Sequence, residues 1–363
     1  MTATTEPATD REAALHRLLQ RLAGQVPDEL VGEARQWLAA GQTTEVAQAL
    51  AFTCLTGHIP VTGAEADLLA GILSDAGEDV GVLTGLHRGA GGPPVAYGMA
   101  PVGPQVLAEP GIRVPYSLDL TVGGDGPGGP DDLDRVAVAA VAAEPGPVGL
   151  WRAWRYPTLD ARHPPPKRLY LVQGGEPVAL AARVGSALEA AGERHPLVEV
   201  FADPGELPQY QRRAWAYSAL LWAARPAEPL RMAAAPDPAA PPATLTDDEA
   251  ERVAAYLGAG VPLLASPERA ADVFDPEHHA DAVPTGIRGD GRWLWSEAVA
   301  YYTDHYGLAP EPDLLAAIRA ADHAAPVVDA VAVHRSLSFL FAAMCDAEQI
   351  GVNHSGEPHV VGA

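Results

Sequence analysis

Residues 275–281 hold the densest group of side chains that could bind a metal ion. The segment reads Asp-Pro-Glu-His-His-Ala-Asp, with His278 next to His279. Adjacent histidines seldom aim at one ion, and neither H-E-x-x-H nor H-x-x-E-H occurs in the segment. We therefore predict a surface loop and no metal site here.

Residues 124–129 match the glycine pattern G-x-G-x-x-G of dinucleotide-binding folds. That pattern binds pyrophosphate through free amides at a helix N-terminus that follows a strand. Pro127 and Pro130 remove two of the amide donors. Three aspartates that would repel phosphate follow directly: Asp131, Asp132 and Asp134. We predict a loop that holds no cofactor.

The motifs of several enzyme classes are missing from the chain. Lys167 is the only lysine, and it stands in Pro-Pro-Pro-Lys-Arg, so there is no P-loop lysine and no kinase strand lysine. No serine lies in a G-x-S-x-G elbow. The sequence therefore supports no assignment to an enzyme class and predicts no cofactor.

Residues 291–310 form an aromatic segment whose chemistry is that of packing and recognition. Trp293 and Trp295 are two apart, so on a strand both indoles point to one face. Residues 289–291, Gly-Asp-Gly, are a hairpin-turn signal directly before them. A capped helix that carries Tyr301 follows. We take Trp293, Trp295 and Tyr301 as candidate binding residues, with the core of a small α+β unit as the alternative.

A second aromatic segment reads Trp151-Arg-Ala-Trp154-Arg-Tyr156. On a strand, Trp154 shares a face with Arg152, and Trp151 shares the other face with Arg155. Trp, Tyr and Arg are enriched at protein interfaces, but they also pack on sheets and form cation–π pairs. Trp151 and Trp154 are therefore candidate binding residues, with sheet packing as the alternative.

The elements that must position these residues suggest an α+β multidomain protein. Residues 10–88 are helical in pattern, which predicts an N-terminal helical bundle. Its second helix opens at Asp28 and ends at Gly41, and the next two open at Thr44 and Thr62. Residues 87–94, rich in glycine and proline, read as a linker.

Residues 95–225 predict a central α+β domain. Strands alternate with two helices, which suggests a ferredoxin-like layer. The expected strands are 136–142, 149–155, 168–172, 197–201 and 219–224, and the expected helices are 177–191 and 207–217.

Residues 245–345 predict a C-terminal helical domain that includes the aromatic hairpin. Its first helix opens with Thr246 as N-cap and Glu249 three residues on, the pattern of a capping box. Residues 225–244 are rich in proline and alanine and read as a second linker.

The amino-acid composition indicates which classes of binding partner suit this protein. A net charge of −23 disfavours nucleic acid and fits a basic protein partner, although an acidic surface also serves solubility alone. We see no signal peptide and no membrane-spanning run, so we expect a cytoplasmic protein. Cys54 and Cys345 stand alone in apolar contexts and predict two buried thiols that do not pair. The sequence leaves the oligomeric state open.

One segment resembles known proteins. Residues 290–295, Tyr301-Tyr302, residues 305–308 and Pro312-Asp-Leu-Leu are similar to a segment of uncharacterised proteins from high-GC actinobacteria. Some of those proteins resemble immunity or accessory proteins of polymorphic-toxin systems. The likeness covers residues 245–320 and implies no catalytic residues.

Three hypotheses follow from these observations. The first is a non-enzymatic, cytosolic protein-binding module, of the immunity type, that inhibits a basic partner. The second is an enzyme of unrecognised class with a site between the middle and C-terminal domains. The third is a structural or assembly protein that oligomerises through its N-terminal helices. Converging titratable groups in a pocket would favour the enzyme, and an accessible aromatic or acidic recognition surface would favour the binder.

Overall fold

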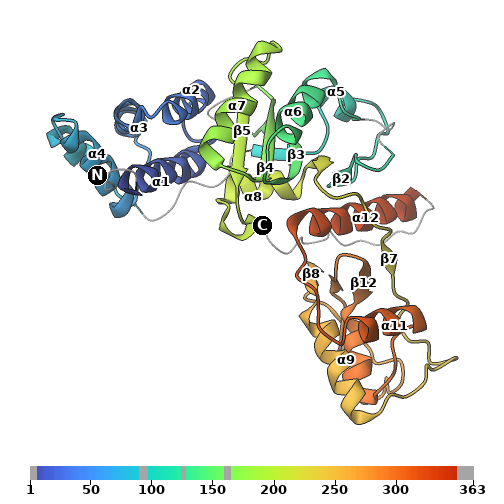
Figure 1. Ribbon diagram of the computed structural model, residues 1–363. Coiled ribbons are helices and arrows are strands. Elements are labelled where there is room, and N and C mark those ends of the chain that lie inside the picture. Colours follow the sequence, from blue (N-terminus) through green and yellow to red (C-terminus); the bar gives the residue numbers. More distant parts are fainter. Residues whose placement is uncertain (1–5, 90–96, 124–127, 159–164, 350–363) are drawn as a thin grey trace. The chain divides into compact units, whose positions relative to one another are not determined.

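The chain divides into two compact units, Met1–Arg225 and Pro226–Ala363. The computed structural model describes residues 6–89, 97–123, 128–158 and 165–349 (Figure 1). Both units combine helices with a β-sheet, which confirms the α+β class. The expected helical and central parts both lie in the first unit, and most of the expected linker at 87–94 lies outside the described residues. No helix in the described ranges combines the length and apolarity needed to cross a membrane.

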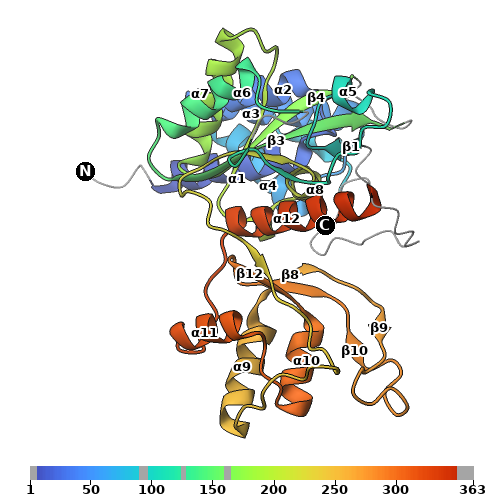
Figure 2. The same cartoon turned by 90° about the vertical axis from the view of Figure 1, so that its right-hand side faces the viewer.

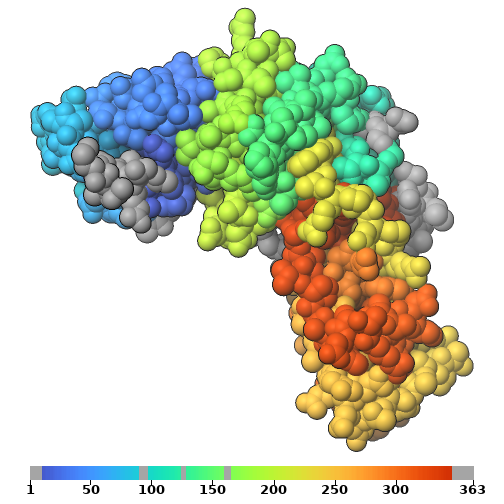
Figure 3. All heavy atoms as spheres, in the orientation of Figure 1, coloured from blue at the N-terminus to red at the C-terminus, as the bar shows by residue number. Residues whose placement is uncertain are grey.

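The first unit begins with a cluster of helices that forms the blue surface in Figure 3. They are α1 (Glu6–Leu22), α2 (Asp28–Ala39), α3 (Thr43–Thr56) and α4 (Gly63–Asp75), followed by the short 3₁₀ helix η1 (Gly81–Gly85). Their buried side chains form one apolar core that includes Leu18, Leu50 and Leu69. The predicted start of α4 is confirmed, because the Thr62 hydroxyl accepts from the Glu65 amide (3.2 Å) and Glu65 accepts from the Thr62 amide (2.7 Å).

A six-stranded sheet follows, in the order β2-β6-β3-β4-β5, with β1 paired to the end of β3. The strands are β1 (Tyr97–Ala100), β2 (Leu118–Asp119), β3 (Pro147–Pro157), β4 (Lys167–Gly174), β5 (Leu197–Phe201) and β6 (Ala219–Ala223). The helices are α5 (Pro104–Leu107), α6 (Asp132–Ala142), α7 (Pro177–Ala190) and α8 (Gln209–Ala216), with the 3₁₀ helix η2 (Pro204–Glu206) before α8. Helices α6 and α7 share a core with one face of the sheet, while α8 packs on the opposite face.

The expected strand at residues 136–142 is wrong, because these residues form the second half of α6. The alternation of valine and alanine resembles a strand, but the start of the segment decides its conformation. The Asp131 carboxylate accepts from the Asp134 amide (3.0 Å) and caps a helix. Ala137 and Val141, four residues apart, are its fully buried apolar positions, as the period of a helix requires. The other four expected strands are confirmed as β3 to β6.

The strand order differs from that of a ferredoxin-like layer. In a split βαβ arrangement another strand lies between the two parallel strands that a helix connects. Here β4 and β5 are adjacent and parallel, and α7 connects them directly. The sheet therefore contains an ordinary βαβ unit that follows the β3–β4 antiparallel pair.

The N-terminal helices cover the outer edge of β5. His16 and Gln20 of α1 both donate from Nε2 to the carbonyl oxygen of Val200, at 2.9 and 2.8 Å. Arg35 of α2 pairs with Glu199 of β5, with 2.7 Å between Nη2 and Oε2, and both side chains are buried. An uncovered edge strand presents unpaired backbone groups that invite foreign strands. These contacts therefore protect the edge and join the helices to the sheet in one unit.

The second unit is built on a four-stranded sheet in the order β7-β12-β11-β8. The strands are β7 (Arg231–Met232), β8 (Val261–Leu264), β11 (Ile287–Gly289) and β12 (Trp293–Ser296), with β9 (Arg269–Ala270) and β10 (Val283–Pro284) paired separately. The helices are α9 (Asp247–Ala259), α10 (Glu297–Tyr306), α11 (Pro312–Ala320) and α12 (Ala330–Gln349). Figure 2 shows α9 and α10 side by side, with β10 next to α10.

The predicted hairpin is confirmed in the second unit. Strands β11 and β12 are antiparallel, and Asp290 in the turn accepts from the amides of Arg292 (2.9 Å) and Trp293 (2.7 Å). The predicted start of α9 is also confirmed, but Thr246 makes no side-chain cap bond. Glu249 instead pairs with Arg319 (2.7 Å). Part of the expected linker at 225–244 forms β7, which pairs in parallel with β12.

The hydrogen bond of His16 to Val200 at the edge of β5 predicts that the stability of the fold depends on pH. Burial first, and then the charge of Arg35, lower the pKa of His16 from 6.5 to about 4. The unfolded chain therefore binds a proton on this residue below pH 6.5, while the folded chain resists it until about pH 4. The free energy of unfolding should consequently fall by about 3 kcal/mol from pH 7 to pH 4 on account of His16.

Urea unfolding at a series of pH values checks this dependence. We expect His16→Gln, which keeps a side-chain N–H for Val200, to lose about 3 kcal/mol less than the wild type between pH 7 and pH 4. The control is His87→Gln, at an exposed position, which should keep the wild-type slope. Equal slopes for wild type and His16→Gln would contradict the burial of a neutral imidazole at this edge.

Candidate functional site

The aromatic residues of β3 lie on opposite faces of the sheet. Trp151 is 0% exposed and packs against Trp215 and Phe201, with ring centroids 6.2 and 6.1 Å away. Trp154 is half-buried, and the guanidinium of Arg168 lies 4.9 Å from its ring. Trp151 is therefore a core residue, as the sheet-packing alternative expects, and only Trp154 keeps an accessible surface.

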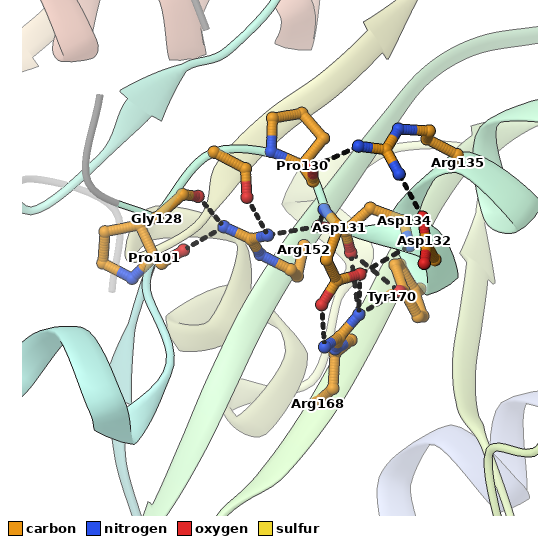
Figure 4. Close-up of polar contacts among 11 residues, drawn as sticks. Pro101, Gly128, Pro130, Asp131, Asp132, Asp134, Arg135, Arg152, Arg168 and Tyr170 are labelled. Carbon is orange, nitrogen blue, oxygen red and sulfur yellow. Dashed lines mark hydrogen bonds and ion pairs between the residues drawn. The ribbon is translucent and has the colours of Figure 1, made fainter. Parts of the chain in front are cut away.

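A network of carboxylates and guanidiniums, buried except for the half-exposed side chain of Asp131, surrounds Asp134 (Figure 4). Asp134 is 0% exposed, pairs with Arg152, and contacts Nη1 of Arg168 at 3.1 Å. Tyr170 donates its hydroxyl proton to Asp134 at 2.8 Å. Arg168 also binds both oxygens of Asp131, at 2.7 and 2.5 Å. Two carboxylates thus balance two guanidiniums within one cluster.

This network has the character of a structural clamp. Arg152 donates to the carbonyl oxygens of Pro101 (3.0 Å) and Gly128 (2.6 Å), so it also ties two loops to the sheet. Burial alone would raise the pKa of Asp131, but the hydrogen bonds from Arg168 hold that pKa below its usual value. Burial, reinforced by Asp134, raises the pKa of Tyr170, so its hydroxyl remains a donor. Because its charges are matched internally, the cluster offers no net charge to a ligand.

The sequence predicts that Asp131 and Asp134 belong to an acidic loop that repels phosphate. The structure gives both residues a different role. Each is neutralised by arginine, and together they cap α6. The spacing of two aspartates three residues apart was a usable sequence signal, since it is a variant of the capping box. Residues 124–127 of the glycine pattern lie outside the described residues.

The two tryptophans of the hairpin are core residues. Trp293 is 7% exposed and Trp295 is 0% exposed. The indole N–H of Trp295 donates to the Leu257 carbonyl oxygen of α9 at 3.2 Å. A Cβ atom at Gly260 would lie 2.3 Å from the Trp295 ring, so this position needs glycine for the close approach. We assign neither indole a direct contact with a partner.

Tyr301, the remaining aromatic candidate, lies on an open groove of about 770 Å³ within the second unit. Its walls come from α9, from α10, from residues of β9, β10 and β11, and from the segment before β9. The charged residues that line it are Glu251, Glu268, Arg269, Arg288, Glu297 and Asp304. Ala254, Ala255, Gly258 and Ala300 form much of the rest of the wall.

Four carboxylates and two arginines line this groove, and only one of the arginines is paired with a carboxylate among the described residues. Arg288 pairs with Glu297, Nε to Oε1 at 2.8 Å, and Arg269 donates to the Ala282 carbonyl oxygen at 2.7 Å. Three exposed carboxylates make no ion pair with any residue in the described ranges: Glu251, Glu268 and Asp304. The groove therefore has a negative excess that a cation can neutralise.

Tyr301 is fixed in the wall by a buried carboxylate behind it. Asp272 is 0% exposed and accepts from the hydroxyls of Tyr301 (3.0 Å) and Tyr306 (2.7 Å) and from the Phe274 amide (2.9 Å). Burial alone would raise the pKa of Asp272, but these donors hold it below its usual value. The ring of Tyr301 also stacks on His305, with centroids 5.4 Å apart. The ring is thereby held as a rigid surface.

The segment 275–281 forms an irregular loop, as predicted. His278 bonds to Asp275 through Nδ1 (2.7 Å), and His279 lies 3.4 Å from the same carboxylate. Across the described part of the chain, no three histidine, cysteine or acidic side chains converge as metal ligands do.

The two cysteines differ from each other. Cys54 is buried in the helical core, and burial raises the pKa of its thiol to about 11, so the reactive thiolate is disfavoured. Cys345 is partly exposed on α12, so the expectation of burial is met by Cys54 alone.

Comparison with known proteins adds no relative: no family model, no curated protein and no solved structure matches this chain. The assignment of a function therefore depends on the residues and their geometry.

Removing the carboxylate of Asp134 should destabilise the first unit. Asp134→Ala leaves Arg152 buried without a carboxylate and removes one of the two carboxylates that bind Arg168, which should cost about 3–5 kcal/mol in the free energy of unfolding. Asp132→Ala, at a fully exposed neighbour in the same helix turn, should cost about 0.5 kcal/mol or less. Urea unfolding measures both, and similar losses for the two variants would refute the clamp.

Truncating Trp295 should destabilise the second unit. Trp295→Ala removes a fully buried indole and should cost about 3–5 kcal/mol. Val327→Ala, at a fully exposed position, is the control and should leave stability nearly unchanged. Urea unfolding of the full chain, fitted with one transition for each unit, gives the two values. A loss below about 1 kcal/mol in a folded Trp295→Ala protein would show that the indole is not part of the core.

Proposed function

We propose that this chain is a non-enzymatic protein-binding module that takes up a basic segment of its partner in the groove of the second unit. One observation carries the proposal: Glu251, Glu268 and Asp304 line the same groove and form no ion pair with any residue that the structure describes. A guanidinium or ammonium group that enters it would find acceptors for charge-assisted hydrogen bonds.

The size and lining of the groove fit side chains of a partner protein. Its volume of about 770 Å³ lies within the range of roughly 300–1,000 Å³ that is usual for binding pockets. Arginine and lysine carry an aliphatic stem behind the charge, and such stems pack on apolar walls. Ala254, Ala255 and Ala300 supply such a wall, and the fixed ring of Tyr301 can stack on a guanidinium.

The negative charge of the second unit supports the same proposal. Residues 226–363 contain 21 aspartates and glutamates against seven arginines. Complementary fields raise association rates by roughly 10–10³-fold at low ionic strength. A basic partner would therefore be drawn to this unit before it docks.

The resemblance to immunity-type proteins extends the proposal to the kind of partner. The similar segment, residues 245–320, includes every residue that lines the groove. An immunity-type inhibitor would occlude a basic cleft of a toxin, and an acidic groove with exposed carboxylates offers suitable chemistry. This extension depends on the groove binding a basic segment in the first place.

Charge-neutral replacement of the three carboxylates tests the groove. The probe is a short peptide of alternating arginine and glycine, titrated at low ionic strength and followed by calorimetry. We expect Glu251→Gln/Glu268→Gln/Asp304→Asn to bind it about 10-fold more weakly than wild type, because three exposed pairs are each worth a few tenths of a kcal/mol.

A matched variant separates the groove from the general field. Asp248→Asn/Glu277→Gln/Asp281→Asn changes the net charge equally at exposed positions that do not line the groove. It should weaken binding by about 2-fold or less. If both triple variants lose the same affinity, the peptide follows the overall charge and the groove is not the site.

A further inference from the structure

The first unit contains a separate pocket of about 180 Å³ beside α1. It is bounded by α1, by the end of β5, by η2 and by the first turn of α7. Because β4 and β5 are parallel, the pocket lies at the carboxyl ends of parallel strands, where α/β proteins usually bind their ligands. None of the residues that carry the groove proposal belongs to this pocket.

Two buried side chains line the pocket and keep an acceptor without a donor. His16 and Gln20 are 5% and 7% exposed, and each uses its Nε2–H on the Val200 carbonyl oxygen. The remaining acceptors are Nδ1 of His16 and Oε1 of Gln20, and no group in the described ranges donates to either of them. Burial lowers the pKa of His16 to about 4, so the ring is neutral at physiological pH and Nδ1 carries a lone pair. Neither atom is among the fully buried polar atoms that lack a partner, so both acceptors remain within reach of a donor that enters the pocket.

The charged residues at the rim of the pocket favour a ligand that is a cation and a hydrogen-bond donor. Glu12, Glu176 and Glu206 line it and make no ion pair with described residues, and Arg17 is the single arginine in the lining. The side chains of Val178, Phe201 and Leu207 add an apolar wall. A ligand that fits must therefore donate hydrogen bonds, carry positive charge and present a hydrocarbon surface.

We propose that this pocket binds a small organic amine. Its ammonium group donates to Nδ1 of His16 and Oε1 of Gln20, and its hydrocarbon part contacts Phe201 and Leu207. The volume equals that of about six water molecules at roughly 30 Å³ each, which limits the ligand to a single ring or a short chain. This site is independent of the groove, so either proposal can fail alone.

Ligands of equal shape and different charge test the chemistry. We would titrate the full chain at neutral pH with benzylamine and n-pentylamine, and with benzyl alcohol and benzoate as neutral and anionic counterparts, using saturation-transfer NMR. We expect at least one amine to bind, and both counterparts to bind at least 10-fold more weakly or not at all. The proposal is overturned if neither amine binds, which would mean a pocket filled by water, or if benzyl alcohol binds as well as benzylamine.

Two changes to the pocket test its location. Ala13 lines the pocket on α1, and Ala13→Leu should fill it and abolish amine binding while every rim charge stays in place. Glu12→Gln/Glu176→Gln should weaken binding about 5- to 10-fold. The matched control, Glu45→Gln/Glu189→Gln, removes two exposed carboxylates elsewhere in the first unit and should change affinity less than about 2-fold.

The outcomes of these variants are distinct. Undiminished amine binding by a folded Ala13→Leu protein overturns the site, whatever the rim variants do. Equal losses in the two double variants overturn the role of the rim. Binding of the arginine peptide to the groove should be unchanged in Ala13→Leu, so failure of one proposal cannot be mistaken for failure of the other.

Discussion

Arginines that neutralise buried carboxylates hold the first unit together. Asp134 and Glu199 are both 0% exposed, on opposite faces of one sheet, and each has a guanidinium partner. Arg152 and Arg168 fix α6 on one face, and Arg35 fixes the N-terminal helices at the β5 edge. A charge that is buried without a partner destabilises the folded state by several kcal/mol. The helices can therefore pack on the sheet only in arrangements that keep these pairs together. The planar fork of arginine suits such sites better than a lysine ammonium, and the chain uses arginine almost exclusively.

This use of arginine has a consequence at the surface. Guanidiniums held in these internal pairs are not available to neutralise exposed carboxylates, which adds to the acidity of the surface in a chain with a net charge of −23. Both proposed sites exploit that excess, though in different ways. The groove of the second unit is wide, and its acceptors are exposed carboxylates such as Glu251 and Asp304. The pocket of the first unit is small, and its acceptors are the buried groups of His16 and Gln20.

Local signals in the sequence predicted local structure well. The cap at Thr62 and the turn at Asp290 correctly predicted α4 and the β11–β12 hairpin, because turns and caps depend on residues a few positions apart. The strand predicted at 136–142 failed because the cap formed by Asp131 outweighed the β-branched pattern. The sites could not be predicted in the same way, since Glu251 and Asp304 come from different helices and meet only through tertiary packing. Of the five aromatic candidates, Tyr301 alone reaches the groove, because burial depends on neighbours that the sequence does not reveal.

Hydrogen exchange of the full chain with and without the arginine peptide tests the central claim most directly, because it locates binding without any mutation. The account predicts slower exchange in backbone amides of α9 and α10 that border the groove, at residues 251–258 and 297–304, and in the segment 266–269. Amides of β12 and of the first unit should exchange at unchanged rates. Protection confined to the first unit, or spread evenly over acidic surfaces of both units, would contradict a binding groove in the second unit.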